Sequence, residues 1–191
     1  MRLLALDQAL VNTGAAFFEG DDIVRTAEIS LSRVGGVDYL HEQANNLRGM
    51  IRLFQPGAVA LEDIHVGSDE KGQAYVKTAL SLAQLLGAMK LVCLDEGLRV
   101  VLVSSSELIT YLYGAAVYVG RDKKKAASIA HARVDLRASP RYAGYENAHT
   151  MKLSDHLADA INIGRVAIGK LKEEQWIQTA QAPAISDLGK R

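Results

Sequence analysis

Three β-prone segments follow one another in the first 31 residues, joined by connections too short to hold a helix. They span residues 1–7, 13–19 and 23–31. Between the second and third lies Gly20-Asp21-Asp22, which has the composition of a hairpin turn. Consecutive strands joined by tight turns pair antiparallel. We therefore expect the chain to open as an antiparallel meander.

Helical and strand patterns alternate after this meander. Apolar residues recur at steps of three and four from Val37 to Phe54, which predicts a helix that ends before Pro56. The next expected elements are a buried strand at 58–62, a polar loop at 67–72, a long helix to about Leu94, a strand at 99–103, a helix opened by the capping box Ser104–Glu107, a helix at 123–134, a loop at 138–152 and a last helix capped by Ser154. The long helix is apolar almost all round, so we expect it to be buried.

This order predicts an α/β fold with a mixed sheet flanked by helices. The sheet begins antiparallel and becomes parallel after the first crossover helix. A length of 191 residues suits one domain. The helical pattern fades after Trp176, so we place the domain at 1–173 and expect 174–191 to form a flexible tail.

The composition limits the classes of partner and compartment. The 22 Lys and Arg equal the 22 Asp and Glu, so any surface for nucleic acid must be local, and 121–141 is the densest basic segment, with seven basic residues against two acidic. No stretch approaches the roughly 18 apolar residues of a membrane span, so we expect no membrane partner. The single cysteine, Cys93, fits a reducing compartment, and the N-terminus lacks the pattern of a signal peptide. We expect a cytoplasmic protein.

Two acidic residues share the same position at the end of an apolar strand. Asp7 and Glu62 are each the first charged group after such a run. Ligands bind at the carboxyl ends of neighbouring central strands in α/β sheets. If the two strands are adjacent, both carboxylates point into one crevice; either residue alone would more simply cap a turn.

A third acidic element begins the last helix. Asp155 and Asp159 lie four residues apart and His156 and Asp159 three apart, so each pair shares a helical face. Asp155 is also explained by the favourable placement of an acid at a helix N-terminus, and His156 by simple exposure. Asp159 is flanked by apolar residues, where an unpaired charge is costly, which favours a bound cation or a basic partner.

Carboxylates gathered without a counter-charge repel one another, so this set calls for a cation. Hard oxygen ligands suit Mg²⁺ or Mn²⁺, and a histidine ligand is tolerated better by Mn²⁺. The chain has no cysteine pair and no HExxH spacing that would indicate zinc.

Four segments together resemble the RuvC-type Holliday-junction resolvases, of the RNase H-like nuclease superfamily that includes retroviral integrases. They occur in the family's order over residues 3–161. They are Leu3-Leu-Ala-Leu-Asp-Gln-Ala-Leu-Val-Asn-Thr-Gly14, Pro56-Gly-Ala-Val-Ala-Leu-Glu-Asp63, Gly120-Arg-Asp-Lys-Lys-Lys125 and Asp155-His-Leu-Ala-Asp-Ala-Ile161.

The resemblance implies an RNase H-like five-stranded sheet and an Mg²⁺-dependent endonuclease. Such an enzyme resolves four-way or other branched DNA as a homodimer, with two metal ions (Mg²⁺, with Mn²⁺ an option) in each site, leaving 5′-phosphate and 3′-hydroxyl ends. A bacterial or phage-infected cell is the expected setting. The implied residues are the metal ligands Asp7, Glu62, His156 and Asp159 with Asp155 beside or among them, the catalytic Lys124 with Lys123 or Lys125 as substitutes, the DNA-binding Arg121, and His65 as a base-stacking residue.

The chain departs from the family pattern in places. Gln8-Ala9 replaces Pro-Gly after the first acid, and Ile109 stands where a second lysine is expected. Three other interpretations remain: an ATP-binding protein of the actin-like or sugar-kinase type, which needs a second lobe that this length does not supply; a catalytically silent DNA-structure-binding domain; and a nuclease for another branched or RNA-containing substrate.

Overall fold

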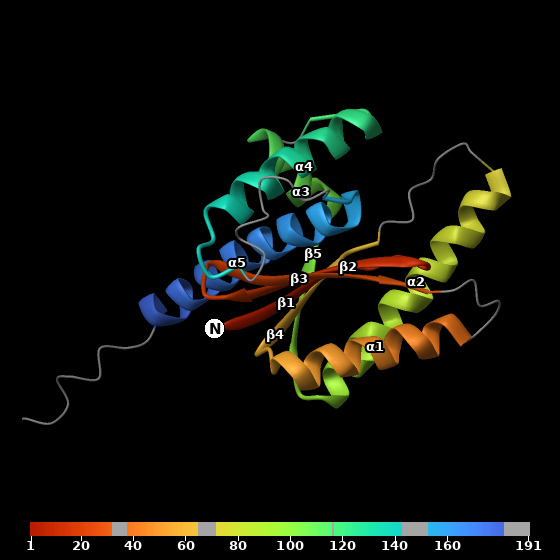
Figure 1. Cartoon of the computed structure of the whole chain (residues 1–191), viewed down its shortest axis with the longest axis horizontal. Helices are drawn as coiled ribbons and strands as arrows, with labels where there is room; N and C mark the ends of the chain where they lie inside the picture. The colour runs from red at the N-terminus through yellow and green to blue at the C-terminus, as the bar shows by residue number, and fades with distance from the viewer. Residues whose placement is uncertain (32–37, 65–71, 116, 143–152, 182–191) are drawn as a thin grey trace, which may run out of the picture.

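A five-stranded mixed sheet forms the middle of three layers (Figure 1). The structure is a computed structural model that describes residues 1–31, 38–64, 72–115, 117–142 and 153–181. The spatial order of the strands is β3-β2-β1-β4-β5; the first three pair antiparallel, and β1, β4 and β5 pair parallel. The strands are β1 (Arg2–Asp7), β2 (Asn12–Glu19), β3 (Asp22–Ser30), β4 (Ala58–Glu62) and β5 (Arg99–Val103).

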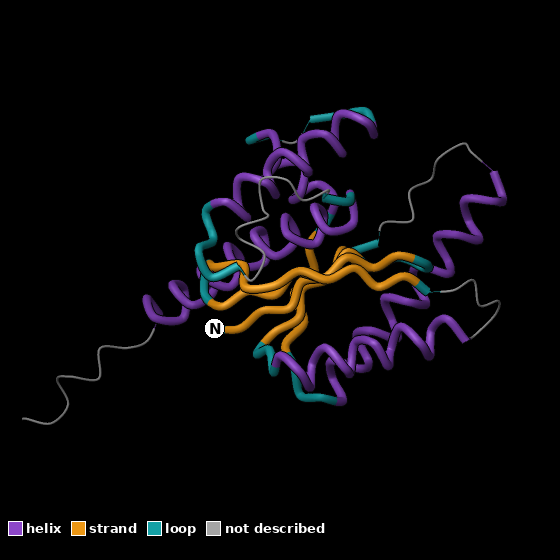
Figure 2. Tube along the Cα trace, in the orientation of Figure 1, coloured by secondary structure: helices purple, strands orange, loops and turns teal. Residues whose placement is uncertain are grey.

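Helices cover both faces of this sheet (Figure 2). One face carries α1 and α2; α5 lies against the other, and α3 and α4 pack on α5. The helices are α1 (Asp38–Phe54), α2 (Gly72–Asp95), α3 (Ser105–Tyr113), α4 (Arg121–Arg137) and α5 (Asp155–Gln181). The predicted α/β mixed sheet, antiparallel and then parallel, is confirmed.

Successive residues of β1 feed two separate cores. Leu3 and Ala5 pack in the cluster on the α5 side, while Leu4 and Leu6 pack in the cluster on the α1 and α2 side. All four are 0% exposed. This alternation is what a central strand requires, because its side chains point to opposite faces and both faces are covered.

Two glycines let α5 approach the sheet closely. A Cβ built on Gly14 of β2 would lie 2.0 Å from the carbonyl oxygen of His156, and one built on Gly164 of α5 would lie 2.2 Å from the Phe18 ring. Real Cβ atoms do not tolerate such contacts, so both positions must lack a side chain. Because Gly14 has no side chain, the first turn of α5 can pack directly on β2, at the position that pairs with Asp7.

Local signals for helix ends were reliable. The Ser104–Glu107 capping box of α3 is present in full, and the Ser154 hydroxyl accepts a hydrogen bond from the Leu157 amide at the start of α5. Helix α5 runs to Gln181, beyond the point where the apolar pattern fades. Residues 182–191 lie outside the described part, so the flexible tail stays a prediction.

The expectation that α2 is buried on all sides was wrong. Met89 and Cys93 are buried against the sheet, but Leu80, Leu91 and Leu94 are 57%, 59% and 68% exposed. A helix packed on an outer face of a three-layer fold has only one side covered by the sheet. Apolar residues on the remaining side are exposed within the part of the chain that the structure describes.

The expectation that no segment could span a membrane also needs correction. Val76–Asp95, within α2, comprises 20 residues with a mean hydropathy of 1.3, which suffices for a span by length and composition. Only 28% of it is buried. A core helix can meet the same criteria, so the property alone is weak support for a membrane segment.

Candidate active site

Asp7 and Glu62 lie on neighbouring strands at the same edge of the sheet. Strands β1 and β4 are parallel and in register, with Leu6 opposite Leu61, so the two acids end adjacent strands. Asp7 is 8% exposed. Burial raises the pKa of Glu62 above its ordinary value of 4.5, and the nearby Asp7 charge raises it further. The predicted pairing of these two strand ends is therefore present in the fold.

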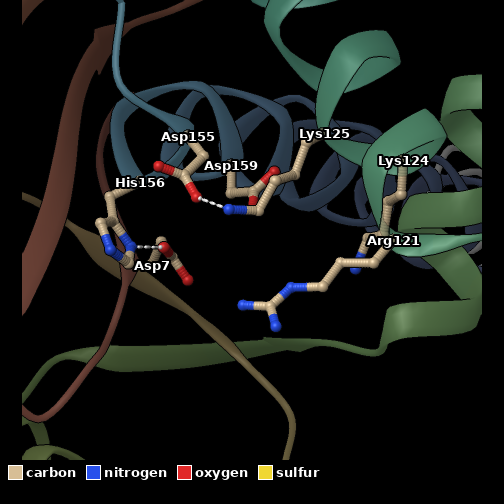
Figure 3. A pocket seen from close by; sticks show the side chains of 7 residues that line it. All are labelled: Asp7, Arg121, Lys124, Lys125, Asp155, His156 and Asp159. Atoms are coloured by element: carbon tan, nitrogen blue, oxygen red, sulfur yellow. Dashed lines mark hydrogen bonds and ion pairs between the residues drawn. The ribbon is translucent and has the colours of Figure 1, made fainter.

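The first turn of α5 brings His156 to Asp7. His156 Nδ1 lies 2.7 Å from Asp7 Oδ2 (Figure 3). The hydrogen bond to Asp7 raises the pKa of His156, which outweighs the opposing effect of its burial. Of the two interpretations of His156, simple exposure is excluded, since its ring is directed at the carboxylate of Asp7.

Asp155 and Asp159 have different partners. Asp155 forms an ion pair with Lys125 of α4, and this hydrogen bond lowers the pKa of its carboxyl group. Asp159 accepts a hydrogen bond from the hydroxyl of Ser128, also on α4. Burial nevertheless raises the pKa of Asp159, with a further increase from Asp7. Of these two acids, Asp155 has a basic partner, whereas Asp159 forms no ion pair among the described residues.

A buried polar network fixes the orientation of Asp159. The amide nitrogen of Asn162 donates to Ser128 O at 3.1 Å and to Ser128 Oγ at 2.8 Å. A hydroxyl has one proton, so Ser128 must direct it at Asp159 while it accepts from Asn162. Ser128 and Asn162 are both 0% exposed. One carboxylate oxygen of Asp159 is therefore held inside the protein by neutral partners.

These groups line a pocket of about 220 Å³ between the end of β1, the start of α5 and the start of α4. The side chains from α5 and α4 face one another across it, and the Arg121 guanidinium points toward Asp7 (Figure 3). Its lining residues are Asp7, Arg121, Lys124, Lys125, Asp155, His156 and Asp159. Burial disfavours the charged forms of Glu62 and Asp159. The positive charge of Lys124 partly offsets this effect on the pKa of both acids, so this lysine lies near them.

Within the described residues, no group of three or more His, Cys, Asp or Glu side chains is arranged to hold a metal ion. The donor chemistry nevertheless fits a hard cation, because Asp7, Glu62 and Asp159 offer carboxylate oxygens whose charges repel one another. His156 is hydrogen-bonded to Asp7, and Lys125 pairs with the neighbouring Asp155, so side-chain movement would have to accompany metal binding.

The remaining predicted residues lie around the pocket or outside the described part. Lys123 is exposed on α4 and does not line the pocket; its carbonyl accepts a hydrogen bond from Tyr113. Arg141, in the predicted basic segment, pairs with Glu19 and so lies near the start of β1, away from Asp7. His65 lies outside the described residues, and its predicted role in base stacking stays a prediction.

Several polar residues that position the acids were not predicted from the sequence. Ser105 Oγ donates to Glu62 Oε1 at 2.9 Å from the first turn of α3. The side chain of Gln8 bonds the main chain of Glu62. Ser128 and Asn162 support Asp159 as described above. Asn162 lies three residues after Asp159, a spacing that places both on one helical face and was the only available signal.

Solved structures share this arrangement of strands and helices. Thermus thermophilus RuvC in complex with a Holliday junction substrate superposes with a TM-score of 0.64 at 14% identity, over 92% of this chain and 96% of the other. The chain has the RuvC fold. Another T. thermophilus RuvC structure gives 0.61 at 16% identity, over 92% of this chain and 96% of the other.

The yeast mitochondrial Holliday junction resolvase gives a TM-score of 0.54 at 13% identity, over 94% of this chain and 83% of the other. No family model matches the chain, and no curated protein matches it by sequence. At such low identity the likeness to RuvC establishes the fold, and the predicted roles of the site residues stay predictions.

Proposed function

We propose that the chain is a structure-specific endodeoxyribonuclease that cleaves four-way or other branched DNA with the help of divalent metal ions. The observation that carries the proposal is the pocket beside Asp7, where acids of β1 and α5 face three cationic side chains of α4, and Glu62 of β4 lies near Asp7. Acids can bind the metal, while the cations bind the phosphate that is to be cleaved. The RuvC fold, shared with structures of junction resolvases, supports the same activity.

Asp7, Glu62, His156 and Asp159 would hold the metal, with Asp155 at its side. Bound Mg²⁺ or Mn²⁺ would supply a water of lowered pKa for attack on the phosphodiester and would stabilise the leaving 3′ oxygen. The protein's own task is to keep these donors converging on one point. Ser105 and Ser128 each donate a hydrogen bond to one carboxylate oxygen, of Glu62 and Asp159 respectively, and the other oxygen would bind the metal.

The cations at the start of α4 would bind the substrate. Lys124 is placed to neutralise charge on the scissile phosphate, because its field already acts on Glu62 and Asp159. Arg121 lines the same pocket. The N-cap of α4 is Gly120, which makes no side-chain capping bond, so the first amide groups of α4 would be available to a phosphate. Binding should therefore weaken steeply with salt.

The proposed experiment compares three substrates. The protein is incubated with a synthetic four-way junction, a linear duplex and an RNA/DNA hybrid, each with Mg²⁺, with Mn²⁺ and with a chelator. Cleavage of the junction alone, only with metal, is expected. Cleavage of the hybrid in preference would assign another substrate within the same fold, and junction binding without cleavage under any condition would indicate a silent DNA-structure-binding domain.

We propose further that the enzyme is a homodimer that packs through the exposed side of α2. Apolar and small residues recur there at steps of three and four: Val76, Leu80, Ala83, Gly87, Leu91 and Leu94. The spacing of these residues is nearly the same when read from either end of the helix. The α2 helix of a second, antiparallel copy would therefore place Val76 against Leu94 and Ala83 against Gly87. Lys77 would then come within reach of Asp95 of the second copy.

Gly87 tests this interface directly. A Cβ at Gly87 meets nothing within 4 Å in the monomer, and the residue lies inside a helix, where glycine costs about 1 kcal/mol relative to alanine. Gly87→Leu should therefore dissociate the dimer, as measured by sedimentation velocity. Gly49→Leu is the matched control, because Gly49 is equally open and exposed on α1. A Gly87→Leu dimer, or a monomeric wild type that binds phosphatidylcholine vesicles, would contradict the proposal.

A further inference from the structure

The side chain of Gln8 holds both main-chain polar groups of Glu62. Gln8 follows β1 directly and is 5% exposed. Its Oε1 accepts a hydrogen bond from the Glu62 amide at 3.1 Å, and its Nε2 donates to the Glu62 carbonyl at 2.5 Å. The amide of a glutamine presents one donor and one acceptor, as a peptide group does. Gln8 thus bonds Glu62 as a neighbouring strand would.

The sheet geometry explains why Glu62 needs such a partner. In parallel strands, successive residues direct their amide and carbonyl groups to alternate sides. The Asp63 amide bonds Val103 of β5 at 2.8 Å, so the groups of Glu62 face the β1 side. Main-chain pairing of β1 with β4 extends only as far as Leu6 and Leu61. Beyond that point the Gln8 side chain replaces the missing strand.

We propose that Gln8 is a positioning residue that fixes Glu62 beside Asp7 so that both carboxylates can bind the same metal centre. Asp7 and Glu62 end adjacent parallel strands, so repulsion between their carboxylates favours separation of the strand ends. Two hydrogen bonds from a buried amide oppose it. The inference rests on the proposed metal-dependent function and deepens it.

The turn after Gln8 is itself held in place. Gln43 of α1 donates to the Ala9 carbonyl at 3.1 Å and to Thr13 Oγ1 at 3.0 Å, and the Thr13 hydroxyl donates to the same carbonyl. The main chain on either side of Gln8 is therefore anchored to β1, to β2 and to α1. Gln8 stands where the resembling family has proline, whose side chain has no polar atom with which to make these bonds.

The test measures metal affinity in two variants. Gln8→Met keeps the approximate shape and removes both hydrogen bonds; Gln8→Asn keeps the amide but is one methylene too short to reach both groups. Each should weaken Mn²⁺ binding by about 10- to 100-fold in calorimetry, as is typical when residues that orient metal ligands are removed. Cleavage should recover at saturating Mn²⁺, because the ligands themselves remain.

Ser139→Ala is the matched control for a general loss of stability. Ser139 is 1% exposed and accepts a hydrogen bond from the Ile23 amide at 3.2 Å; it follows the C-terminal end of α4, whereas the pocket lies at the N-terminal end. It should lower the Tm without changing Mn²⁺ affinity. Hydrogen exchange of the Glu62 amide gives a metal-free readout, and it should accelerate in Gln8→Met but not in Ser139→Ala.

Two negative results have separate meanings. A wild-type protein that binds no Mn²⁺ would overturn the proposed metal site and this role of Gln8 together. Wild-type binding with unchanged affinity in both Gln8 variants would overturn the positioning role alone and leave the proposed nuclease intact.

Discussion

The charged side chains at the two ends of β1 are arranged differently: opposite charges pair at its start, and like charges lie close together at its end. Near its start, Glu19 of β2 pairs with Arg2 at 3.0 Å through one carboxylate oxygen and with Arg141 through the other, so one acid has two basic partners. At its end, Asp7 and Glu62 meet with partial compensation from a histidine and a lysine. Charges at the first end attract one another, whereas the two carboxylates at the second end repel one another and would be stabilised by a bound cation. Changes at the two ends should therefore have opposite consequences for stability and for activity.

The largest difference is expected for Asp7→Asn. The change removes the carboxylate nearest to both His156 and Glu62 and should lower the rate of junction cleavage by about a thousand-fold or more, a loss of ~4 kcal/mol of transition-state stabilisation. Single-turnover assays with excess enzyme measure this rate. The metal-free variant should keep or exceed wild-type stability, because less repulsion remains around Glu62. Residual cleavage near the wild-type rate would remove Asp7 from the metal site.

Lys124→Ala should have the next largest effect. Loss of a positive charge directed at the scissile phosphate should reduce the cleavage rate by roughly 100-fold while junction affinity falls less. Lys123→Ala is the matched control, because Lys123 is an exposed neighbour that does not line the pocket. Filter binding and single-turnover cleavage separate the two quantities. A greater loss of affinity than of rate would make Lys124 a phosphate anchor.

Separate replacement of His156 and Asp155 tests the contribution of the first turn of α5. His156 contacts Asp7, whereas Asp155 is neutralised by Lys125. His156→Ala should therefore weaken Mn²⁺ binding by about 10-fold or more, and Asp155→Ala should change it less. Calorimetric titration measures both affinities. If both variants bound Mn²⁺ as tightly as wild type, Asp159 would be the residue of this helix that binds the metal.

Most of the fold followed from local sequence patterns because each pattern has a local physical cause. The turn at Gly20 and the capping box at Ser104 are formed by residues close in the chain, and both are present. Asp7 and Glu62 could be paired in advance because a parallel sheet brings strand ends together. Their environment was thus predictable, although their roles stay predictions.

Features that depend on distant partners were not predictable. The hydrogen bonds of Gln8 join residues 54 positions apart, and the same residue was read only as a departure from a family pattern. Helix α2 was expected to be buried since its composition is apolar on most sides. The apolar composition of α2 indicates how much apolar surface needs a packing partner. It does not indicate whether that partner belongs to this chain or to another molecule.

The pH dependence of stability should differ between the two ends. A carboxyl group with a raised pKa holds its proton more tightly in the folded state, so its stabilising contribution is present at low pH and is lost as pH rises through the folded pKa. Glu62 and Asp159 have this sign. In a chelator, Glu62→Gln should therefore become more stable than wild type as pH rises through the folded pKa of Glu62.

Thermal unfolding across pH measures this difference between wild type and Glu62→Gln. Shifts of opposite sign at Asp155 and Glu107 are present in both proteins and cancel in the comparison. Added Mg²⁺ should stabilise wild type at neutral pH more than the variant. If wild type instead gained stability relative to Glu62→Gln as pH rises, the charge of Glu62 would already be balanced by positive groups in the metal-free protein.

The smallest effect is expected at the opposite end, for Glu19→Gln. The change removes the charge that pairs with Arg2 and Arg141, whose side chains are 50% and 55% exposed. Exposed ion pairs contribute about 0–1 kcal/mol each, so unfolding by denaturant should show a loss of roughly this size. The loss should shrink at high salt, and junction cleavage should be unchanged. If Glu19→Gln slowed cleavage as much as Asp7→Asn does, the charges at the two ends of β1 would be coupled through the strand. The distinction between a start that stabilises the fold and an end that carries the chemistry would then be wrong.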